Sequence, residues 1–358
     1  MRYLYILFAS ISFMTSCNSD DLVAQESIPT TEENTYFPPN NSSEWQTKTP
    51  ESLNWNTSNL NDLESFLEEK NSKSFIILHK GKIVVEYYMN NHNVSTPWYW
   101  ASAGKTLTTA TVGIAQDEGL LNINHKVSDY IGLGWTSAPT EKEDLITCKH
   151  LLTMTSGLDD TLGDDYSPSN LQYIADAGSR WAYHNVYVKL QDVVAQASSQ
   201  SWESYFNTAL KNKIGMTGMW NFFGNSNVYW STTRSMARFG LLMSEKGVWD
   251  GNKIISEAFL NEATTTSQPI NEAYGYLWWL NGKESYHLPQ TQFEFTGELI
   301  PNAPTDVYCA LGKNEQKIYI YPSRDLVIIR MGQAADEDSF ALSTFDSDLW
   351  ARINAIIN

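Results

Sequence analysis

The stretch Trp98-Tyr-Trp-Ala-Ser-Ala-Gly-Lys-Thr106 predicts how this chain is organised. Ser102 and Lys105 lie three residues apart, and the apolar run that follows, from Thr106 to Gln116, predicts a helix. Because residues i and i+3 share one helix face, a helix that begins at Ser102 places the hydroxyl beside the amine. Lys105 is the only Asp, Glu, Lys or Arg between Glu86 and Asp117. Burial in this run would lower the pKa of its amine, and a neutral amine beside a serine can make that serine a nucleophile.

Other interpretations of this stretch fail on single positions. A phosphate-binding loop needs a glycine five residues before Gly104, where the chain has Tyr99. A nucleophile elbow needs a glycine at position 100, which is Trp100. Ser102 can cap its helix as well, but Lys105 has the wrong charge for a helix N-terminus. Ser-x-x-Lys occurs once in the chain, where a helix follows a predicted hairpin, and this context favours an activated serine.

Composition limits the classes of partner. The 358 residues suffice for one large domain, and 42% of them are hydrophobic. A net charge of −17 argues against nucleic acid as a partner. The six His are scattered and no metal-binding motif occurs, so the sequence predicts neither a metal site nor a cofactor. Three Cys are too few for a disulfide scaffold, and Cys148 and Cys309 can pair or stay free.

The N-terminal region predicts export. Residues 1–17 combine Arg2 with about a dozen mostly apolar residues and end in Met14-Thr-Ser-Cys17, which resembles the lipobox of bacterial lipoproteins. We therefore expect a lipid-anchored protein of the bacterial cell envelope, in the periplasm or on the outer membrane, attached to the membrane only through Cys17. The alternative is a plain secretory signal with an incidental Cys. Residues 18–50 are rich in Ser, Thr, Asn, Pro and Glu and predict a disordered tether.

The remaining chain, 51–358, predicts one α/β domain of the α+β type. Ser74–His79 and Lys82–Met89 form a predicted hairpin around Lys80-Gly81. Three further strands are predicted at Asp306–Leu311, Gln316–Tyr321 and Leu326–Met331. Helices are predicted at 61–70, 102–118, 146–154, 186–197, 202–211, 233–246 and 339–357. We expect a five-stranded antiparallel sheet (51–100 and 300–358) flanked by the first and last helices, with a mostly helical insertion (101–299) and a site in the cleft between the two parts.

A serine–lysine pair benefits from a second proton carrier and from an oxyanion hole. Tyr-x-Asn occurs at Tyr88, Tyr183 and Tyr205, and only Tyr183-His-Asn185 lies in a predicted loop, where chemistry is commonly placed. Asn185 can alternatively cap the helix that follows. The N–H groups of Ser102 and of Lys313, or of a residue adjacent to Lys313, are the candidate oxyanion donors, because Gly312 allows close backbone approach at a strand entry.

These motifs, in this order, resemble the penicillin-recognising serine hydrolases, specifically the class C β-lactamase-like branch. Supporting phrases are Ile146-Thr-Cys-Lys-His-Leu-Leu-Thr-Met-Thr-Ser-Gly-Leu158, Gly275-Tyr-Leu-Trp-Trp279 and Gln316-Lys-Ile-Tyr-Ile-Tyr-Pro322. The resemblance covers roughly residues 70–357 and implies the β-lactamase/transpeptidase-like fold. It implies that Ser102 is the nucleophile, Lys105 the base or its modulator, and Tyr183 the proton shuttle. It also implies that Asn185, Gly312, Lys313 and Asn314 surround the substrate.

One departure from the family pattern concerns the substrate. β-Lactamases and carboxypeptidases of this branch have Lys/His-Thr-Gly beside the site, whereas this chain has Leu311-Gly312-Lys313, followed by Asn314 and an added anion, Glu315. We therefore expect an esterase or amidase acting on a small ester, amide or peptide, since Gly-x-x-x-Gln resembles the esterase and 6-aminohexanoate-dimer hydrolase members. The alternatives are a class C-type β-lactamase, a D-alanyl-D-alanine carboxypeptidase or D-aminopeptidase, and a penicillin-binding or sensing lipoprotein without turnover. An apolar acyl group is suggested by the aromatic candidates for the cleft wall, which are Trp98, Trp100, Trp181, Trp230, Trp278 and Trp279.

Overall fold

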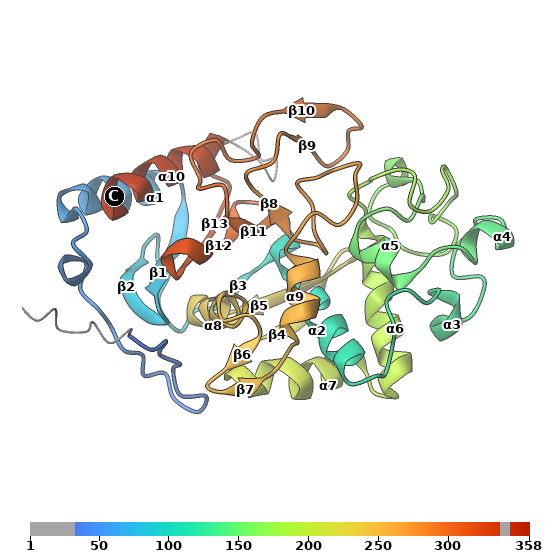
Figure 1. Ribbon diagram of the computed structural model, residues 1–358, viewed down its shortest axis with the longest axis horizontal. Helices are drawn as coiled ribbons and strands as arrows, with labels where there is room; N and C mark the ends of the chain where they lie inside the picture. Colours follow the sequence, from blue (N-terminus) through green and yellow to red (C-terminus); the bar gives the residue numbers. More distant parts are fainter. Residues whose placement is uncertain (1–32, 337–343) are drawn as a thin grey trace, which may run out of the picture. The chain divides into compact units, whose positions relative to one another are not determined.

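The computed structural model describes residues 33–336 and 344–358 (Figure 1). Thr35–Asn358 forms one compact unit, and the unit before it, Met1–Asn34, lies outside the described residues except for its last two. The predicted leader, Cys17, and the predicted tether as far as residue 32 therefore lie outside the described part of the chain. Within the described part, no helix has the length and apolar character needed to cross a membrane.

The central sheet is antiparallel throughout, in the order β2-β1-β13-β12-β11-β8. Its strands are β1 (Ser72–His79), β2 (Lys82–Tyr88), β8 (Trp279–Leu280), β11 (Tyr308–Gly312), β12 (Gln316–Tyr321) and β13 (Leu326–Gly332). The five predicted strands are confirmed, but the sheet has a sixth. β8 joins the edge through the pairing of Trp279 with Cys309, and two residues are too few to show a strand period in the sequence.

Helices cover both faces of this sheet. Alternate residues of a strand point to opposite faces, and β12 shows which helix takes which face. Tyr319 packs edge-on against Trp350 of α10 (Thr344–Ile357), which lies beside α1 (Leu60–Glu69) as predicted. Ile318 instead faces Gly240 of α8 (Thr233–Ser244). The prediction that placed α8 in the helical insertion was therefore wrong, because this helix forms the second cover of the sheet.

The helical part is built around α2 (Lys105–Asp117), which is buried along the whole of Lys105–Ala115. Such a helix can be buried on every side because its residues are small or apolar apart from Lys105. The other helices are α3 (Ser128–Ile131), α4 (Thr140–Glu143), α5 (Cys148–Leu152), α6 (Lys189–Ser198), α7 (Trp202–Phe206) and α9 (Glu257–Ala263). Short strands complete the fold, namely β3 (Trp98–Tyr99), β4 (Met219–Phe223), β5 (Ser226–Ser231), β6 (Val248–Trp249), β7 (Asn252–Lys253), β9 (Ser285–His287) and β10 (Glu294–Thr296).

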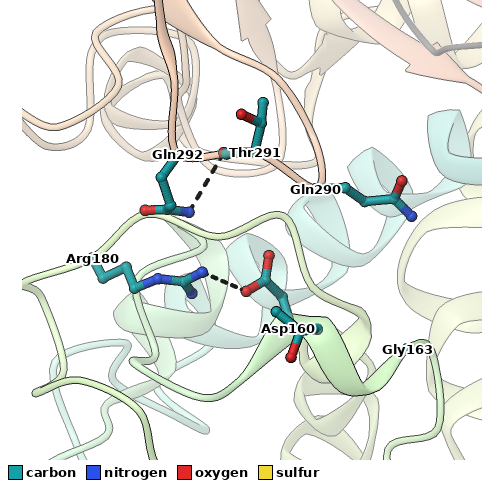
Figure 2. Close-up of a pocket in the computed structure, with 7 residues that line it drawn as sticks. Asp160, Gly163, Arg180, Gln290, Thr291 and Gln292 are labelled. Atoms are coloured by element: carbon teal, nitrogen blue, oxygen red, sulfur yellow. Dashed lines mark hydrogen bonds and ion pairs between the residues drawn. The ribbon is translucent and has the colours of Figure 1, made fainter.

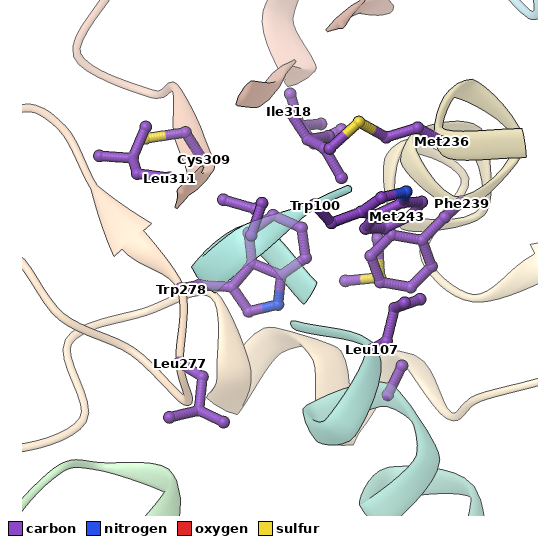
Figure 3. Close-up of a cluster of buried hydrophobic side chains, with 14 of the residues drawn as sticks. Trp100, Leu107, Met236, Phe239, Met243, Leu277, Trp278, Cys309, Leu311 and Ile318 are labelled. Atoms are coloured by element: carbon purple, nitrogen blue, oxygen red, sulfur yellow. The ribbon is translucent and has the colours of Figure 1, made fainter. Parts of the chain in front are cut away.

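The hydrophobic core continues from the sheet into the helical part. Figure 3 shows Trp100, Phe239 and Trp278 gathered between α8, β11 and the start of α2. Trp100 and Trp278 are fully buried, and Phe239 stacks on Trp278 with 6.2 Å between ring centroids. Cys148 and Cys309 are both buried in this core, and both thiols are free. Trp100, two residues before Ser102, thus fixes this part of the chain in the core.

The segment 35–50 is part of the compact unit, which corrects the predicted end of the tether at residue 50 and start of the domain at 51. Gln46 and Lys48 exchange backbone hydrogen bonds with Ile83 of β2, and Trp45 Nε1 donates to the Gly81 carbonyl at 2.7 Å. Arg238 of α8 donates to the carbonyls of Pro38 and Pro39. The exposed backbone of an edge strand supplies such partners, and a segment without hydrophobic periodicity gives no sign of this docking in its sequence.

Candidate active site

The turn that carries Ser102 is held by strand β5 on one side and contacts Gly312 of β11 on the other. Ala101–Gly104 forms a 3₁₀ turn between β3 and α2, and Ala101 has a left-handed φ of 47°. Backbone strain of this kind persists only where the surroundings impose it. Trp100 supplies part of that constraint, since its N–H donates to the Tyr229 carbonyl at 2.9 Å and its Nε1 to Ser231 Oγ at 2.8 Å. Strand β5 therefore fixes the position of the turn.

Ser102 and Lys105 are in direct contact, with 2.8 Å between Lys105 Nζ and Ser102 Oγ. The predicted helix begins as a 3₁₀ turn and becomes α-helical at Lys105. Side chains at i and i+3 eclipse one another in a 3₁₀ turn, so this opening aligns the two groups more closely than an α-helix would. Ser102 remains half-buried, whereas Lys105 is buried. The predicted hydroxyl–amine pair is confirmed as a contact.

Two tyrosines enclose the amine of Lys105. Its Nζ lies 4.8 Å from the ring centroid of Tyr183 and 4.6 Å from that of Tyr187. Burial by itself lowers the pKa of Lys105, but Tyr183, Tyr187 and Asp164 raise it, and the net shift is upward. The expectation that burial leaves Lys105 with a lowered pKa was therefore wrong in direction. Lys105 Nζ donates to Ser102 Oγ, and a sequence shows nothing of the two tyrosine rings that surround this amine.

Of the three Tyr-x-Asn motifs, the structure brings only Tyr183 to Lys105. Tyr88 and Tyr205 instead donate to carboxylates, Glu86 at 2.7 Å and Glu118 at 2.8 Å. Tyr183 is half-buried, and its ring stacks on that of Trp279 with centroids 5.8 Å apart. This stacking on the β8 edge strand fixes the phenol beside the amine. Lys105 is thus the common neighbour of Ser102 and Tyr183.

Asn185 holds loops together. Its Nδ2 donates to the carbonyls of Asp164 at 2.8 Å and Asn225 at 3.1 Å. These bonds connect the loop after α5 and the tip of the β4–β5 hairpin to the segment that carries Tyr183. Since both N–H bonds of the amide are occupied, a contact between Asn185 and a substrate would use Oδ1. The predicted substrate-binding role of Asn185 stays a prediction.

Gly312 brings the end of β11 against the serine turn. A Cβ placed on Gly312 would lie 2.5 Å from the Trp100 carbonyl oxygen and 2.9 Å from the Ala103 nitrogen. Real Cβ atoms do not approach backbone this closely, so only glycine fits here. The close backbone approach predicted from the sequence is confirmed, and it places the candidate donor Lys313 next in the chain after this contact.

The turn from Lys313 to Glu315 is fixed through its carbonyl groups. Asn314 and Glu315 both have a left-handed φ of 61°. Gln316 Nε2 donates to the carbonyls of Lys313 at 3.3 Å and Asn314 at 2.8 Å, and Arg330 Nη1 donates to those of Asn314 at 2.8 Å and Glu315 at 3.0 Å. The side chain of Asn314 donates to Tyr99 Oη at 2.6 Å, whereas the Lys313 side chain is exposed.

Glu315 does not bring its charge to the substrate side of this turn, contrary to the sequence interpretation. The side chain is buried, and its Oε2 lies 2.7 Å from Lys317 Nζ. Lys317 also bonds to Asp346 of α10 at 2.8 Å, and Tyr319 Oη donates to the same carboxylate. Glu315 and Lys317 are two residues apart and share a sheet face. The Lys317 ammonium therefore compensates the charge of Glu315 beneath α10.

Three residues of this site were missed in the sequence. Tyr187 encloses Lys105, Tyr99 receives the bond from Asn314, and Arg330 holds the turn. No sequence signal pointed to Tyr187, because Tyr183 lies in the loop before the 3₁₀ helix Asn185–Val188 and the helical spacing rule does not apply to this pair. An arginine inside the apolar strand Leu326–Met331 was a signal, since arginine is almost never fully buried unless paired.

The close approach of Gly312 leads to a prediction. Gly312→Ala is expected to lower kcat for an ester substrate by about a hundredfold, because a displacement of about 1 Å in a reacting geometry can cost that much. Gly240→Ala is the matched control, since its Cβ would meet Val327 at 2.5 Å in the core, away from the serine turn. Both variants should lose thermal stability, but only Gly312→Ala should lose kcat per folded molecule. Equal kcat values would show that the contact has no role at the site.

Comparison with known proteins agrees with this geometry. The Beta-lactamase family profile matches residues 64–346, and no curated protein matches the chain. Similar solved structures include a protein assigned as a β-lactamase from Bacteroides dorei (14% identity, TM-score 0.67, covering 85% of this chain and 99% of that one). Others are a protein assigned as a 6-aminohexanoate-dimer hydrolase from Bacillus anthracis (17%, 0.66, 90% and 89%) and a family VIII carboxylesterase (14%, 0.61, 83% and 97%).

The predicted β-lactamase/transpeptidase-like fold is confirmed by these structures, whose low sequence identities establish the fold alone. The family is established separately, because its profile spans most of the chain and includes Ser102, Lys105, Tyr183 and Gly312. With an antiparallel sheet covered on both faces and a serine–lysine pair at the start of its central helix, this chain belongs to the Beta-lactamase family of serine hydrolases.

Proposed function

We propose that this protein hydrolyses a small ester or amide through an acyl-enzyme on Ser102. The observation that carries the proposal is the 2.8 Å contact between Lys105 Nζ and Ser102 Oγ in a turn fixed by Trp100 and Gly312. A half-buried serine that receives a hydrogen bond from a buried ammonium is poised to carry negative charge. The similar structures include a family VIII carboxylesterase and a protein assigned as a 6-aminohexanoate-dimer hydrolase, and these support this reaction class.

In the proposed acylation step, Ser102 Oγ attacks the carbonyl carbon of the substrate. Lys105 enters as an ammonium and therefore stabilises charge on Oγ rather than accepting its proton. Tyr183 relays that proton, because its oxygen accepts from Ser102 while its own hydroxyl proton passes to the leaving group. The new bond joins Oγ to the acyl carbon, and the bond to the leaving alcohol or amine breaks.

The negative oxygen formed in that attack needs donors that are already in place. In the proposal these are the N–H groups of Ser102 and Lys313. Gln316 and Arg330 donate hydrogen bonds to the carbonyls of residues 313–315 and thereby fix the peptide planes after Gly312. These bonds support the assignment. Water then attacks the acyl carbon, with Tyr183 relaying a proton back to Ser102.

The reaction class can be tested with two substrates. The purified protein is expected to hydrolyse a short p-nitrophenyl ester in the steady state and to turn over nitrocefin far more slowly, because the threonine that helps hold a β-lactam carboxylate is absent from Leu311-Gly312-Lys313. Nitrocefin turnover at ordinary enzyme rates of about 1–1,000 s⁻¹ would instead favour a β-lactamase or a D-amino-acid peptidase. A single stoichiometric burst without steady state would identify a binding or sensing protein.

A further inference from the structure

A small antiparallel sheet, β3-β5-β4, lies beside the turn that carries the serine. Tyr99, Trp230 and Met219 are paired in one row across its three strands. Residues paired on neighbouring strands share a face of a sheet, and every second residue along each strand returns to that face. We call this surface the Tyr99 face, and its apolar members are Tyr99 of β3, Met219 and Phe223 of β4, and Val228 and Trp230 of β5.

The opposite face of this sheet belongs to the hydrophobic core. Trp220 of β4 and Tyr229 of β5 lie on it, with their ring centroids 5.2 Å apart. Trp100 is fully buried and packs edge-on against Tyr229, with 5.3 Å between centroids. The side chains of Tyr99 and Trp230 alternate with these residues along their strands and therefore point away from that core.

The Tyr99 face is open to solvent over much of its area. Met219 is 60% exposed and Phe223 is 77% exposed. Tyr99 and Trp230 are half-buried, and their ring centroids lie 5.4 Å apart. A single exposed apolar residue needs no explanation, but apolar side chains that adjoin one another commonly mark a binding site.

Two hydrogen bonds attach this sheet to the reaction centre. Tyr99 Oη accepts from Asn314 Nδ2 at 2.6 Å, in the turn that carries the candidate oxyanion donor. The Asn225 carbonyl, in the tip of the β4–β5 hairpin, accepts from Asn185 Nδ2 at 3.1 Å. Strand β5 also contacts both the serine turn and the 3₁₀ helix that begins at Asn185. The face is therefore continuous with the candidate active site.

The register of β3 and β5 places Ser102 alongside this face. The N–H of Trp100 donates to the Tyr229 carbonyl at 2.9 Å, so the pairing of the two strands continues to this residue. Because the strands are antiparallel, Ser102, two residues later, lies toward the start of β5. That strand starts at Ser226, which is paired with Phe223. An acyl chain that leaves Ser102 can therefore run along the face toward Phe223.

The chemistry of the face favours an apolar group as its occupant. Its remaining members, Asn221 and Ser226, are uncharged, and the Tyr99 hydroxyl already accepts a bond from Asn314. A charged group on this surface would lose hydration without gaining a counter-charge from the face. An alkyl or aryl group instead removes apolar surface of both partners from water, which favours binding.

The structure corrects most of the aromatic wall that the sequence suggested. Four of the candidate tryptophans are at most 1% exposed and belong to the core, namely Trp100, Trp181, Trp278 and Trp279. Trp98 precedes Tyr99 in β3 and therefore belongs to the opposite side of the sheet. Of the six candidates, Trp230 is the one that lies on the Tyr99 face.

A polar cavity of about 360 Å³ offers no alternative site for an apolar group. Its lining residues come from the loop after α5, from Arg180 and from the β9–β10 connection. The two charged residues of the lining, Arg180 and Asp160, pair with one another at 2.6 Å (Figure 2). None of the seven lining residues belongs to β3, β4 or β5. The cavity is therefore separate from the Tyr99 face.

We propose that the Tyr99 face binds an apolar acyl group of the substrate, with Trp230 and Phe223 as residues that determine specificity. This inference rests on the proposed hydrolysis at Ser102 and names the class of substrate. In that reaction the acyl carbonyl oxygen accepts from the N–H of Lys313, which is adjacent to the residue that bonds to Tyr99. The leaving group receives its proton from Tyr183 and so lies on the other side of the acyl carbon.

The test compares p-nitrophenyl hexanoate with p-nitrophenyl acetate, which share a leaving group and differ by four methylene groups in the acyl chain. The measured quantity is the hexanoate-to-acetate ratio of kcat/KM in each variant, divided by the same ratio in the wild-type chain, so that intrinsic reactivities cancel. Phe223→Ser is expected to lower this ratio by about tenfold, because the added methylene groups lose apolar contact. Thermal unfolding should stay close to wild type, since the side chain is largely exposed.

Phe222→Ser is the matched control. Phe222 is the preceding residue of the same strand, is 64% exposed and points to the opposite face, so its ratio should equal that of wild type. Wild-type ratios in both variants, with both esters hydrolysed, would overturn the binding surface and leave the proposed function intact. A fall in Phe222→Ser but not in Phe223→Ser would overturn the assignment of the face. Failure of the wild-type chain to hydrolyse either ester would overturn both proposals.

Two further measurements examine other occupants of the face. Phenyl acetate and 4-butylphenyl acetate differ only in the leaving group. If Phe223→Ser changed their ratio of kcat/KM but left the hexanoate-to-acetate ratio unchanged, the acyl assignment would be overturned. Size-exclusion chromatography tests a second copy of the chain as the occupant. A wild-type dimer that becomes a monomer in Phe223→Ser, with unchanged ester ratios, would also overturn the proposal.

Discussion

Replacing Ser102 by alanine is expected to abolish turnover of a short p-nitrophenyl ester, with a loss on the order of a thousandfold or more in kcat. The reason is chemical rather than structural, since the Oγ that forms the acyl bond is removed while Lys105, Tyr183 and the turn remain. Ser102 is half-buried, and its hydroxyl bonds to Lys105. The folded structure should therefore lose little, and thermal unfolding monitored by circular dichroism should stay close to wild type.

Ser74→Ala is the matched control for this experiment. Ser74 is fully buried, and its Oγ lies 2.6 Å from Thr233 Oγ1 between β1 and α8, so the variant also removes one bonded hydroxyl. Its kcat should remain near wild type even if its stability falls. A fluorophosphonate that acylates serine nucleophiles should add its mass to the wild-type and Ser74→Ala proteins but not to Ser102→Ala. If Ser102→Ala hydrolysed the ester at the wild-type rate, the assignment of Ser102 as the nucleophile would be refuted.

Much of the fold could be predicted because its signals are local. The β1–β2 hairpin, α2, α8 and the strands β11 to β13 each have their own periodicity and turn residues, and all of them are observed. Ser102 and Lys105 were recognisable because the contact between them depends on one helical turn. Tyr183 was singled out because its motif lies in a predicted loop, whereas Tyr88 ends a predicted strand and Tyr205 lies in a predicted helix, and the family resemblance then implied its role.

What could not be predicted depends on contacts between distant residues. The environment of the Lys105 amine is formed by tyrosine rings that come from another loop and from the helix after it, and these tyrosines raise the pKa of Lys105. The sequence suggested that Glu315 adds a negative charge near the substrate, whereas in the fold it lies beside Lys317 and Asp346. The hairpin β4–β5 escaped notice because β4 is mostly exposed and lacks alternation, with Phe222 and Phe223 adjacent in its sequence. In each case the residue pattern is compatible with several environments, and only the assembled fold selects one.

The second large effect is expected at Arg330, which is fully buried under the turn that follows Gly312. Its five N–H groups reach five acceptors, namely Ser72 Oγ and the carbonyls of Lys70, Asn314, Glu315 and Gln333. Gly332 makes room for it, since a Cβ there would lie 2.4 Å from Arg330 Cζ. Burial lowers the pKa of Arg330 to about 10, which leaves the guanidinium charged at neutral pH. One side chain thus joins the candidate oxyanion turn to the start of β1 and the end of β13.

Arg330→Met is expected to destabilise the protein by about 3–5 kcal/mol, the usual cost of removing one partner from a buried charged network. It should also lower kcat for the ester by about a hundredfold per folded molecule, because the Glu315 carbonyl loses its donor, the Asn314 carbonyl keeps only the bond from Gln316, and the turn is held less firmly around the oxyanion. Urea unfolding measures the first effect. Steady-state kinetics at a temperature where the variant is folded measure the second, and a purely structural arginine would not change that value.

Arg238→Met is the control that separates the loss of stability from the loss of kcat. Arg238 is also a buried arginine, and within the described part of the chain it donates to the carbonyls of Pro38, Pro39, Ser42 and Ile214, none of which belongs to the turn. Its loss should cost a comparable free energy of unfolding and leave kcat unchanged. If both variants lost the same fraction of kcat, Arg330 would be only a structural residue. A selective loss in Arg330→Met, partly restored in Arg330→Lys, would show that the charge beneath the turn positions the group that stabilises the oxyanion.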